Sequence, residues 1–382
     1  MKIVADENIP LVREVFGQLG DISTVNGRKI NSAQLKHADL LLVRSVTKVN
    51  NELLKDSSVS FVGTATIGTD HIDIEYLKNR HIEFASAPGS NANSVGEYII
   101  TALLVIAQKK SFKLKDKTIG IIGAGNTGSS VEQKSRALGM KVFLNDPPLK
   151  RATGNPKYLE LNQLLSCDII TCHVPLNKNG KDKTYHLADE IFFKSLRRGV
   201  IFINASRGAV ADNSALLEYI KNGHLGGCVL DVWENEPQIS NELLKAVDIG
   251  TPHIAGYSYD GKVKGTEMLY NSACSFFNKP IIWNPKEFMP EAPCPAVLID
   301  NTHEPPQALL HASAVKVYNI TEDYELLCKG LEMPSEEQAS YFDKLRKEYP
   351  KRREFHNTEV KLRKNCDNLG KMLKGLGFKV NS

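Results

Sequence analysis

A glycine-rich turn, GAGNTG from Gly123 to Gly128, follows the apolar run TIGII and precedes a segment compatible with a helix. In this context Gly123 permits a tight turn, Gly125 lets the backbone approach a phosphate group, and Gly128 allows the helix to pack closely. The free amides at the start of that helix, at Asn126 and Thr127, can bind a pyrophosphate. The turn therefore predicts a dinucleotide site, although other glycine-rich turns between a strand and a helix share this pattern.

An acidic residue ends the next apolar run along the chain. Asp146 closes the run KVFLND, 18 residues after Gly128. A carboxylate in this place accepts hydrogen bonds from the ribose hydroxyls of an adenosine. Because the same carboxylate repels a ribose 2′-phosphate, the sequence favours NAD over NADP.

Three ionisable residues follow three later apolar runs: Arg207 in INASRG, Glu236 in VWENEP and His253 in TPHIAG. Ligands bind outside the carboxyl ends of the strands in a doubly wound sheet, so all three can face one cleft. A histidine is suited to take the proton of an alcohol as hydride leaves, and a carboxylate beside it stabilises the imidazolium. An arginine can hold a substrate carboxylate. Each residue alone is more often structural, but the set predicts oxidation of a hydroxy acid.

Composition excludes several classes of protein. The chain has 382 residues, 42% hydrophobic and 24% charged, which is ordinary globular usage. The longest apolar run, residues 98–107, is far shorter than the roughly 20 residues that cross a bilayer, and the first residues do not resemble a signal peptide. The seven cysteines are scattered and never form CxxC, so we expect neither disulfides nor a metal site. We expect a cytoplasmic protein without a membrane partner.

Short apolar runs that alternate with helix-compatible stretches predict two parallel sheets. The runs before residue 88 are KIVA, LLLVR, SFVGTA and IEFASA, and those after residue 117 are TIGIIGA, KVFLND, DIITCHVP, GVIFINAS, CVLDVW and VDIGTPHI. We therefore expect an α/β fold in which a doubly wound Rossmann domain for NAD is inserted in a flavodoxin-like substrate domain.

Two long helices are expected to connect these sheets. One spans about residues 93–109, where Ser94 and Glu97 fit an S-x-x-E capping box, and the other spans residues 261–278. Prolines between residues 280 and 295 mark a linker. We expect the substrate domain at 1–92 and 257–286, the NAD-binding Rossmann domain at 93–256, and a C-terminal α+β domain at 287–382.

The C-terminal stretch is basic. Residues 341–382 contain 12 Lys and Arg against 5 Asp and Glu, whereas the net charge of the whole chain is only +4. An arm that binds nucleic acid is one interpretation. We favour a solvated face of mixed charge, because acidic residues are interleaved and Leu345, Tyr349 and Phe355 interrupt the run.

The strings GAGNTG, INASRG, DVWENEP and HIAG, together with Asp146, resemble the D-isomer-specific 2-hydroxyacid dehydrogenases over residues 1–285. Narrower strings are similar to the branch of that family that oxidises 4-phospho-D-erythronate in the vitamin B6 pathway; they are VRSVTKVN, GTATIGTDHID, APGSNANSVGEY, HIAGYSYDGKVKGT and FDKLRKEYPKRREF. The resemblance implies an NAD-dependent enzyme that forms (R)-3-hydroxy-2-oxo-4-phosphobutanoate. It also implies a homodimer built through the C-terminal domain.

The resemblance further implies roles for individual residues. Arg207 and Glu236 match active-site residues, and His253 matches the proton-transfer group. The substrate positions match Ser45, Thr66 and Tyr257. The cofactor positions match Asp146, Val174, Ala205, Ser206, Arg207, Asp231 and Gly256, with Val174 where some members have threonine.

Two other functions use the same scaffold. 3-Phosphoglycerate dehydrogenase resembles the chain through its first two domains, and NAD-sensing transcriptional corepressors resemble these dehydrogenases and carry the same three ionisable residues. The phosphosugar-acid strings and the tail string from Phe342 to Phe355 favour the 4-phospho-D-erythronate branch over both. We therefore expect a phosphorylated sugar acid and a second copy of this chain as partners, and no nucleic acid.

Overall fold

Apolar strands near the start of the chain form a five-stranded parallel sheet with the strand order β2-β1-β3-β4-β5. Its strands are β1 (Lys2–Asp6), β2 (Asp21–Val25), β3 (Leu40–Val43), β4 (Phe61–Thr64) and β5 (Glu83–Ala85). The order is that of flavodoxin-like folds, as predicted. The computed structural model describes residues 1–300, 304–363 and 366–381. Its chain divides into two compact units, and this sheet belongs to unit 1, which comprises Met1–Asn91 and Ser258–Glu291.

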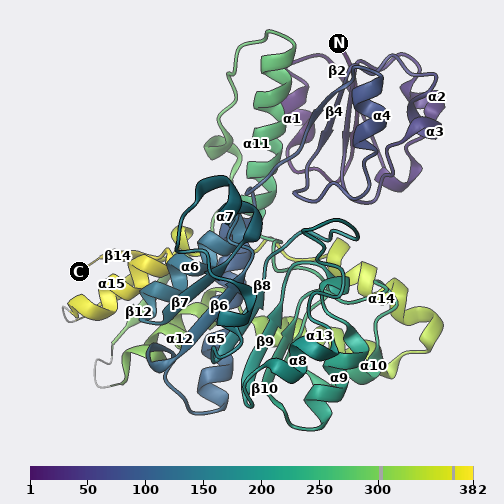
Figure 1. Ribbon diagram of the computed structural model, residues 1–382. Helices are drawn as coiled ribbons and strands as arrows, with labels where there is room; N and C mark the ends of the chain where they lie inside the picture. The colour runs from purple at the N-terminus through teal and green to yellow at the C-terminus, as the bar shows by residue number, and fades with distance from the viewer. Residues whose placement is uncertain (301–303, 364–365, 382) are drawn as a thin grey trace. The chain divides into compact units, whose positions relative to one another are not determined.

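Helices cover both faces of this sheet (Figure 1), and they pack on side chains that point alternately to one face and the other along each strand. Ile3, Leu40 and Leu42 pack in one core with α1 and α11, whereas Leu41 and Val43 pack in a second core with α2, α3 and α4. The helices of unit 1 are α1 (Val12–Phe16), α2 (Ser32–Leu35), α3 (Asn51–Leu54), α4 (Ile74–Asn79) and α11 (Tyr259–Phe276). Residues that follow position 257 therefore complete the core of unit 1.

Two details of unit 1 differ from the sequence prediction. The sequence indicated four strands, and β2 is a fifth: its residues DISTV alternate in polarity and all keep some exposure at the sheet edge. An edge strand lacks the continuous apolar run of a buried one. Helix α11 lies two residues earlier than predicted, because the Oγ of Ser258 accepts a hydrogen bond from the N–H of Gly261 at 2.9 Å and caps its first turn.

Unit 2, Ala92–Tyr257 with Ala292–Ser382, contains a six-stranded parallel sheet in the order β7-β6-β8-β9-β10-β11. Its strands are β6 (Thr118–Ile122), β7 (Lys141–Asn145), β8 (Ile169–Cys172), β9 (Val200–Asn204), β10 (Leu225–Leu230) and β11 (Ile249–Gly250), which match the six predicted runs. An isolated parallel bridge also pairs Leu144 with Tyr158. Counting that bridge as a third strand gives the Rossmann order 3-2-1-4-5-6 with one strand added, so the doubly wound prediction is confirmed.

The helices around this sheet are α5 (Ala92–Lys109), α6 (Asn126–Ala137), α7 (Pro147–Thr153), α8 (Glu190–Ser195), α9 (Asn213–Lys221) and α10 (Asn241–Ala246). The described residues of the C-terminal segment form a three-stranded parallel sheet, in the order β12-β13-β14, and four α-helices. Its elements are β12 (Ala296–Ile299), α12 (Pro306–Val317), α13 (Ile320–Cys328), α14 (Ser335–Lys347), β13 (Glu359–Leu362), α15 (Asp367–Leu376) and β14 (Lys379–Asn381).

The C-terminal segment shares the cores of the Rossmann sheet. Leu310 and Leu373 belong to the core that contains Ile121, and Phe342 belongs to the core on the other face. Helices α12 and α15 lie beside α5 and α6 (Figure 1). The segment therefore packs as part of unit 2, and its division from the Rossmann domain at residue 287 stays a prediction.

Helix α5 is buried on nearly all sides, with 14 of its 18 residues buried. The predicted capping box is wrong, because Ser94 and Glu97 both lie within the helix and bond to distant segments. The Oγ of Ser94 donates to the carbonyl of Ala255 at 3.0 Å, and Glu97 accepts the N–H of Phe355 at 2.9 Å. Among the described residues, neither α5 nor another helix is long and apolar enough to cross a membrane.

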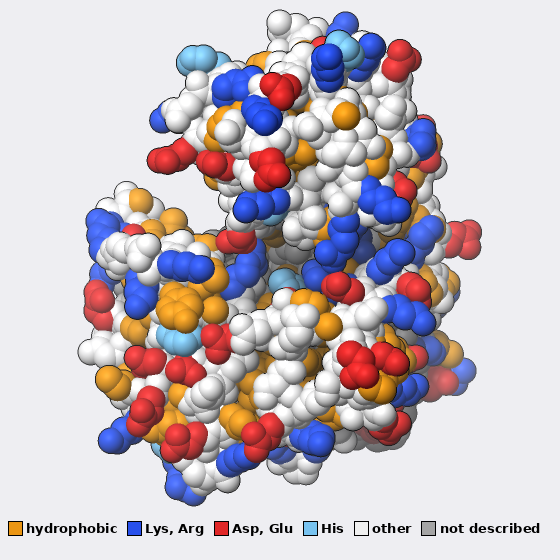
Figure 2. Space-filling model, turned by 90° about the vertical axis from the view of Figure 1, so that its right-hand side faces the viewer, with side chains coloured by type: hydrophobic (Ala, Val, Ile, Leu, Met, Phe, Trp, Pro, Cys, Tyr) orange, Lys and Arg blue, Asp and Glu red, His pale blue; other side chains and the backbone are white. Residues whose placement is uncertain are grey.

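The basic tail is not a wholly solvated face, contrary to the sequence prediction. Arg352, Arg353 and Glu354 are only 6%, 7% and 5% exposed. The Nη2 of Arg352 donates to the carbonyl of Ala255 at 3.0 Å, and its guanidinium lies 4.0 Å from the ring centre of Tyr318. Buried charges require such partners, because desolvation is costly. On the face of the molecule that Figure 2 shows, basic and acidic side chains are interspersed.

A buried ionic cluster joins α5, α6 and the C-terminal segment. The Nδ2 of Asn93 donates to Glu97 at 3.0 Å and to Glu354 at 2.6 Å, and the Nζ of Lys134 donates to the carbonyl of Leu376 at 2.7 Å. Burial, and then the charge of Glu354, raise the pKa of Glu97 to about 8. Burial lowers the pKa of Lys134. The folded protein therefore keeps Glu97 protonated to a higher pH than the unfolded chain does.

Replacing Glu97 with Gln should make stability less dependent on pH. In the unfolded chain this carboxyl ionises above about pH 4.5, but in the folded chain it stays protonated to about pH 8. The unfolded state therefore releases the proton first, and the free energy of unfolding falls as pH rises between these values. Thermal unfolding at pH 5 and pH 8 should show a smaller loss of Tm for Glu97→Gln than for the parent chain. The exposed control Glu336→Gln should keep the parent slope, and equal slopes for both variants would contradict the assignment.

Candidate active site

The glycine turn after β6 is tight at both ends and open in the middle. Gly123 has a φ of +90°, and its N–H donates to the carbonyl of Asn145 at 2.8 Å. A Cβ on Gly128 would lie 1.9 Å from the carbonyl oxygen of Gly123, whereas a Cβ on Gly125 would meet nothing within 4 Å. The turn therefore leaves space at Gly125, where a diphosphate approaches the backbone in dinucleotide sites.

The start of α6 offers backbone amides beside this space. Its N-cap is Gly125, which has no side chain to cap the first turn at Asn126 and Thr127. Asp146, at the end of β7, accepts the N–H of Ala124 at 2.9 Å and so lies against the turn. Amides for a pyrophosphate and a carboxylate for a ribose are thus present together, and these residues fit a dinucleotide.

The other predicted cofactor residues follow the carboxyl ends of neighbouring strands. Val174, after β8, lies against the turn, since a Cβ on Gly123 would come within 2.8 Å of its Cγ1. Ala205 and Ser206 follow β9, and the Oγ of Ser206 donates to the side chain of Asn204 at 2.8 Å. Asp231 follows β10, and Gly256 lies in the loop after β11. Strands β6 and β8 flank the topological switch point, where doubly wound sheets bind ligands.

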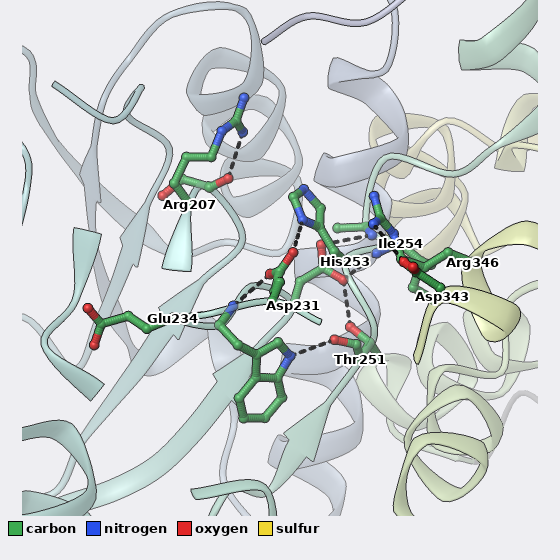
Figure 3. Close-up of polar contacts among 12 residues, drawn as sticks. Arg207, Asp231, Glu234, Thr251, His253, Ile254, Asp343 and Arg346 are labelled. Carbon is green, nitrogen blue, oxygen red and sulfur yellow. Dashed lines mark hydrogen bonds and ion pairs between the residues drawn. The ribbon is translucent and has the colours of Figure 1, made fainter. Parts of the chain in front are cut away.

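His253, labelled in Figure 3, forms a direct pair with Glu236, and the two residues lie in the loops after β11 and β10. The Nδ1 of His253 lies 2.7 Å from Oε2 of Glu236, and the other carboxylate oxygen accepts the N–H of Trp233 at 2.8 Å. Burial opposes ionisation of Glu236, but His253, together with the N–H of Trp233 and the charge of Arg346, outweighs it and lowers the pKa of the carboxyl. The pair is therefore a carboxylate fixed against one nitrogen of an imidazole.

The buried carboxylate of Asp231 shapes the loop that carries His253. It accepts hydrogen bonds from the Oγ1 of Thr251 at 2.7 Å, the N–H of Ile254 at 2.7 Å and the N–H of Ala255 at 3.0 Å. The N–H of His253 donates to the carbonyl of Asp231 at 2.7 Å, and His253 has a φ of +58°. Burial raises the pKa of Asp231, which these donors oppose. The sequence indicated Asp231 only as a cofactor position and missed this positioning role.

Arg207 follows β9 at the same edge of the sheet. Its Nη1 donates to the carbonyl of Ser206 at 2.8 Å, and its own carbonyl accepts the side chain of Asn204 at 2.9 Å. Figure 3 shows Arg207 on one side of His253 and Arg346 on the other. The structure therefore places the three predicted catalytic residues in one unit, after three adjacent strands.

Two arginines of the C-terminal segment reach the loop after β11, and sequence reasoning missed both. Arg352 donates to the carbonyl of Ala255, two residues after His253. The Nη2 of Arg346 donates to the hydroxyl of Tyr257 at 3.2 Å. The sequence signal that could have indicated them is the tail string from Phe342 to Phe355, in which arginines alternate with aromatic residues.

The remaining predicted substrate residues lie in unit 1. Ser45 is exposed in the turn after β3, beside Arg44, whose Nε donates to the buried carboxylate of Asp6 at 2.9 Å. Thr66 follows β4, and its Oγ1 donates to the carbonyl of Gly68 at 2.9 Å and lies 2.8 Å from the Oγ1 of Thr64. Both residues follow carboxyl ends of strands in the flavodoxin-like sheet.

Comparisons with known proteins define the class. Residues 105–255 match the family described as D-isomer specific 2-hydroxyacid dehydrogenase, NAD binding domain, and residues 288–377 match a domain family of unknown function. Among solved structures, D-lactate dehydrogenase from Aquifex aeolicus with NAD and lactic acid is 28% identical, with a TM-score of 0.59 over 73% of this chain and 96% of its own. 3-Phosphoglycerate dehydrogenase from Entamoeba histolytica with NAD is 26% identical, with a TM-score of 0.63 over 73% and 95%. The chain thus has the NAD-binding domain of this dehydrogenase class.

Relatives at full length narrow the class further. Erythronate-4-phosphate dehydrogenase from Tolumonas auensis is 45% identical over 100% of both chains, and that from Escherichia coli O127:H6 is 44% identical over 94% of both. The protein from Hahella chejuensis with the same name is 41% identical over 100% of both chains. The chain belongs to the erythronate-4-phosphate dehydrogenase family.

Replacing Gly125 with Ala should weaken NAD binding and leave the fold intact. The new Cβ meets no atom of the protein, but it occupies the space beside the helix amides where a diphosphate lies. We expect the Kd for NAD, measured by calorimetry, to rise about tenfold or more, or ~1.4 kcal/mol, with an unchanged Tm. Gly370→Ala in α15 serves as the control and should leave the Kd unchanged. An unaltered Kd in Gly125→Ala would show that NAD does not approach this turn.

Proposed function

We propose that this protein oxidises the 2-hydroxyl of 4-phospho-D-erythronate with NAD, giving (R)-3-hydroxy-2-oxo-4-phosphobutanoate in pyridoxal 5′-phosphate biosynthesis. The observation that carries the proposal is the 2.7 Å pair of His253 and Glu236 in the same unit as an open glycine turn. Membership of the erythronate-4-phosphate dehydrogenase family supports the substrate. The proposed cofactor contacts are the turn, Asp146, Val174, residues 205–207, Asp231 and Gly256.

The proposed proton transfer uses the free nitrogen of His253. The bond to Glu236 places a proton on Nδ1, which leaves the lone pair of Nε2 to accept the hydroxyl proton of the substrate. The imidazolium that forms is stabilised by the ionised Glu236. Bound NAD supplies the acceptor for the hydride that leaves C2. Arg207 holds the substrate carboxylate and polarises the neighbouring oxygen.

The proposal assigns substrate contacts to Ser45, Thr66 and Tyr257. Hydroxyl groups can donate to or accept from the oxygens of a phosphate or a carboxylate. All three follow the carboxyl ends of parallel strands within their own units. The resemblance to the 4-phospho-D-erythronate branch supports these roles.

We also propose that two copies of the chain associate through the C-terminal segment and that the enzyme works in the cytoplasm. Resemblance to the family supports the homodimer. Strand β12 lies at the edge of the three-stranded sheet and leaves Leu298 54% exposed, which supports an interface on this segment.

Variants of the histidine pair should separate chemistry from cofactor binding. His253→Ala should reduce kcat for oxidation by about 10² to 10⁴-fold, with an unchanged Kd for NAD. Glu236→Gln should reduce kcat less, because the imidazolium loses its carboxylate. Steady-state rates and calorimetry with NAD measure the two effects. Near-normal oxidation by His253→Ala, or an unchanged kcat in Glu236→Gln, would refute the assigned roles.

The substrate is tested by the absorbance of NADH formed from NAD and each acid. We expect kcat/KM for 4-phospho-D-erythronate to exceed that for 3-phosphoglycerate, which is one carbon shorter, by about 10- to 200-fold. Preference for 3-phosphoglycerate would favour 3-phosphoglycerate dehydrogenase. Tight NAD binding without turnover of either acid would favour a corepressor on this scaffold.

A further inference from the structure

Arg346 lies in the last turn of α14, in the C-terminal segment, and reaches the end of the His253 loop. Its Nη2 donates to the hydroxyl of Tyr257 at 3.2 Å, and its guanidinium lies 5.8 Å from the centre of the Tyr257 ring. The Arg346 side chain is only 23% exposed. A cation is therefore held against a residue that the proposed function assigns to substrate.

The partners of Arg346 within the protein do not use its full capacity to donate. Its Nη1 lies 4.0 Å from the carboxylate of Asp343, at the limit of an ion pair, and Asp343 is 41% exposed. Its Nε is buried without a hydrogen-bond partner among the residues that the structure describes. An ion pair at this distance with a carboxylate that is partly in solvent contributes little, whereas a guanidinium offers five donors suited to a phosphate or a carboxylate. The guanidinium of Arg346 therefore has donors available to bind a further anion.

The order of charges in the substrate matches the order of side chains around His253, a step that rests on the proposed function. In 4-phospho-D-erythronate the carboxylate is one carbon from the reacting C2, and the phosphate is at C4 on the other side. Figure 3 shows Arg207 and Arg346 on either side of His253. With the carboxylate on Arg207, the phosphate extends toward the side of Arg346 and Tyr257.

We propose that Arg346 binds the 4-phosphate of the substrate, with Tyr257 fixed beside it as a second contact. The residue lies within 288–377, outside the NAD-binding domain match at 105–255. The C-terminal segment then determines specificity for a phosphorylated acid, in addition to its place in the core of unit 2. Chemistry at C2 remains with His253, Glu236 and Arg207.

The test compares 4-phospho-D-erythronate with D-erythronate, which lacks the phosphate. Arg346→Gln removes the charge, Arg346→Lys keeps the charge without the planar fork, and Arg363→Gln, an exposed arginine of the same segment, is the control. Loss of a buried charge partner predicts a fall of about 30-fold or more in kcat/KM for the phosphorylated acid, mainly through KM. In Arg346→Gln, kcat/KM for D-erythronate should fall less than threefold (~0.6 kcal/mol). For the phosphorylated acid, kcat/KM of Arg346→Lys should lie between those of the parent chain and Arg346→Gln, and the control should match the parent chain.

Inorganic phosphate gives a second measurement that needs no turnover of D-erythronate. As an inhibitor competitive with the substrate, phosphate should lose affinity in Arg346→Gln by about the same factor as the substrate. An unchanged preference for the phosphorylated acid, or an unchanged inhibition constant for phosphate, would overturn the assignment. An equal loss for both acids would also overturn it, since Arg346 would then act through Glu236 or Tyr257. If the parent chain fails to oxidise 4-phospho-D-erythronate, the proposed function itself fails, whereas normal parent activity with unaffected variants refutes Arg346 alone.

Discussion

The need to satisfy one buried carboxylate, that of Asp231, sets the geometry of the candidate site. A buried charge is tolerated only with hydrogen-bond donors around it, and here the donors are Thr251, Ile254 and Ala255. Meeting that requirement curls the loop after β11 around the carboxylate and holds His253 in a left-handed conformation. Few residues other than glycine adopt this conformation, and the hydrogen bonds around the loop hold His253 in it. The position of the His253 imidazole therefore follows from the hydrogen bonds that the buried Asp231 carboxylate requires.

The C-terminal segment also holds this loop. Arg352 and Ser94 both donate to the carbonyl of Ala255, so three parts of the sequence meet at one peptide group. The hydroxyl of Tyr98 lies 2.8 Å from the Oγ1 of Thr251, which extends the polar contacts into α5. Hydrogen bonds between buried polar groups are electrostatically stronger in a low dielectric than in water. The C-terminal segment is thus structurally coupled to the loop, whatever contacts it makes with a second copy.

Local chemistry explains which features could be predicted from the sequence. Apolar runs of buried strands and a glycine turn are local signals, so the Rossmann strands and the turn at Gly123 were found from the sequence. Order along the chain also brought Glu236 and His253 to neighbouring strand ends, although their catalytic roles stay predictions. The failures share a different cause: Glu97 and Arg352 each have partners about 100 to 260 residues away in the sequence. No local pattern encodes such pairings, so Glu97 resembled a helix cap and Arg352 a solvated charge.

The insertion of one unit into the other has a consequence for synthesis on the ribosome. The core of unit 1 requires Val263, Leu269 and Tyr270 of α11, but the 166 residues of 92–257 are translated between its sheet and this helix. At a translation rate of about 5 to 20 residues per second, α11 is synthesised roughly 10 to 30 s after the strands of the sheet. During that interval the face formed by Ile3, Leu40 and Leu42 has no helix α11 to cover it. A sheet that forms in this interval has α1 on this face but not α11, so part of its apolar surface stays open to other chains until the helix is made.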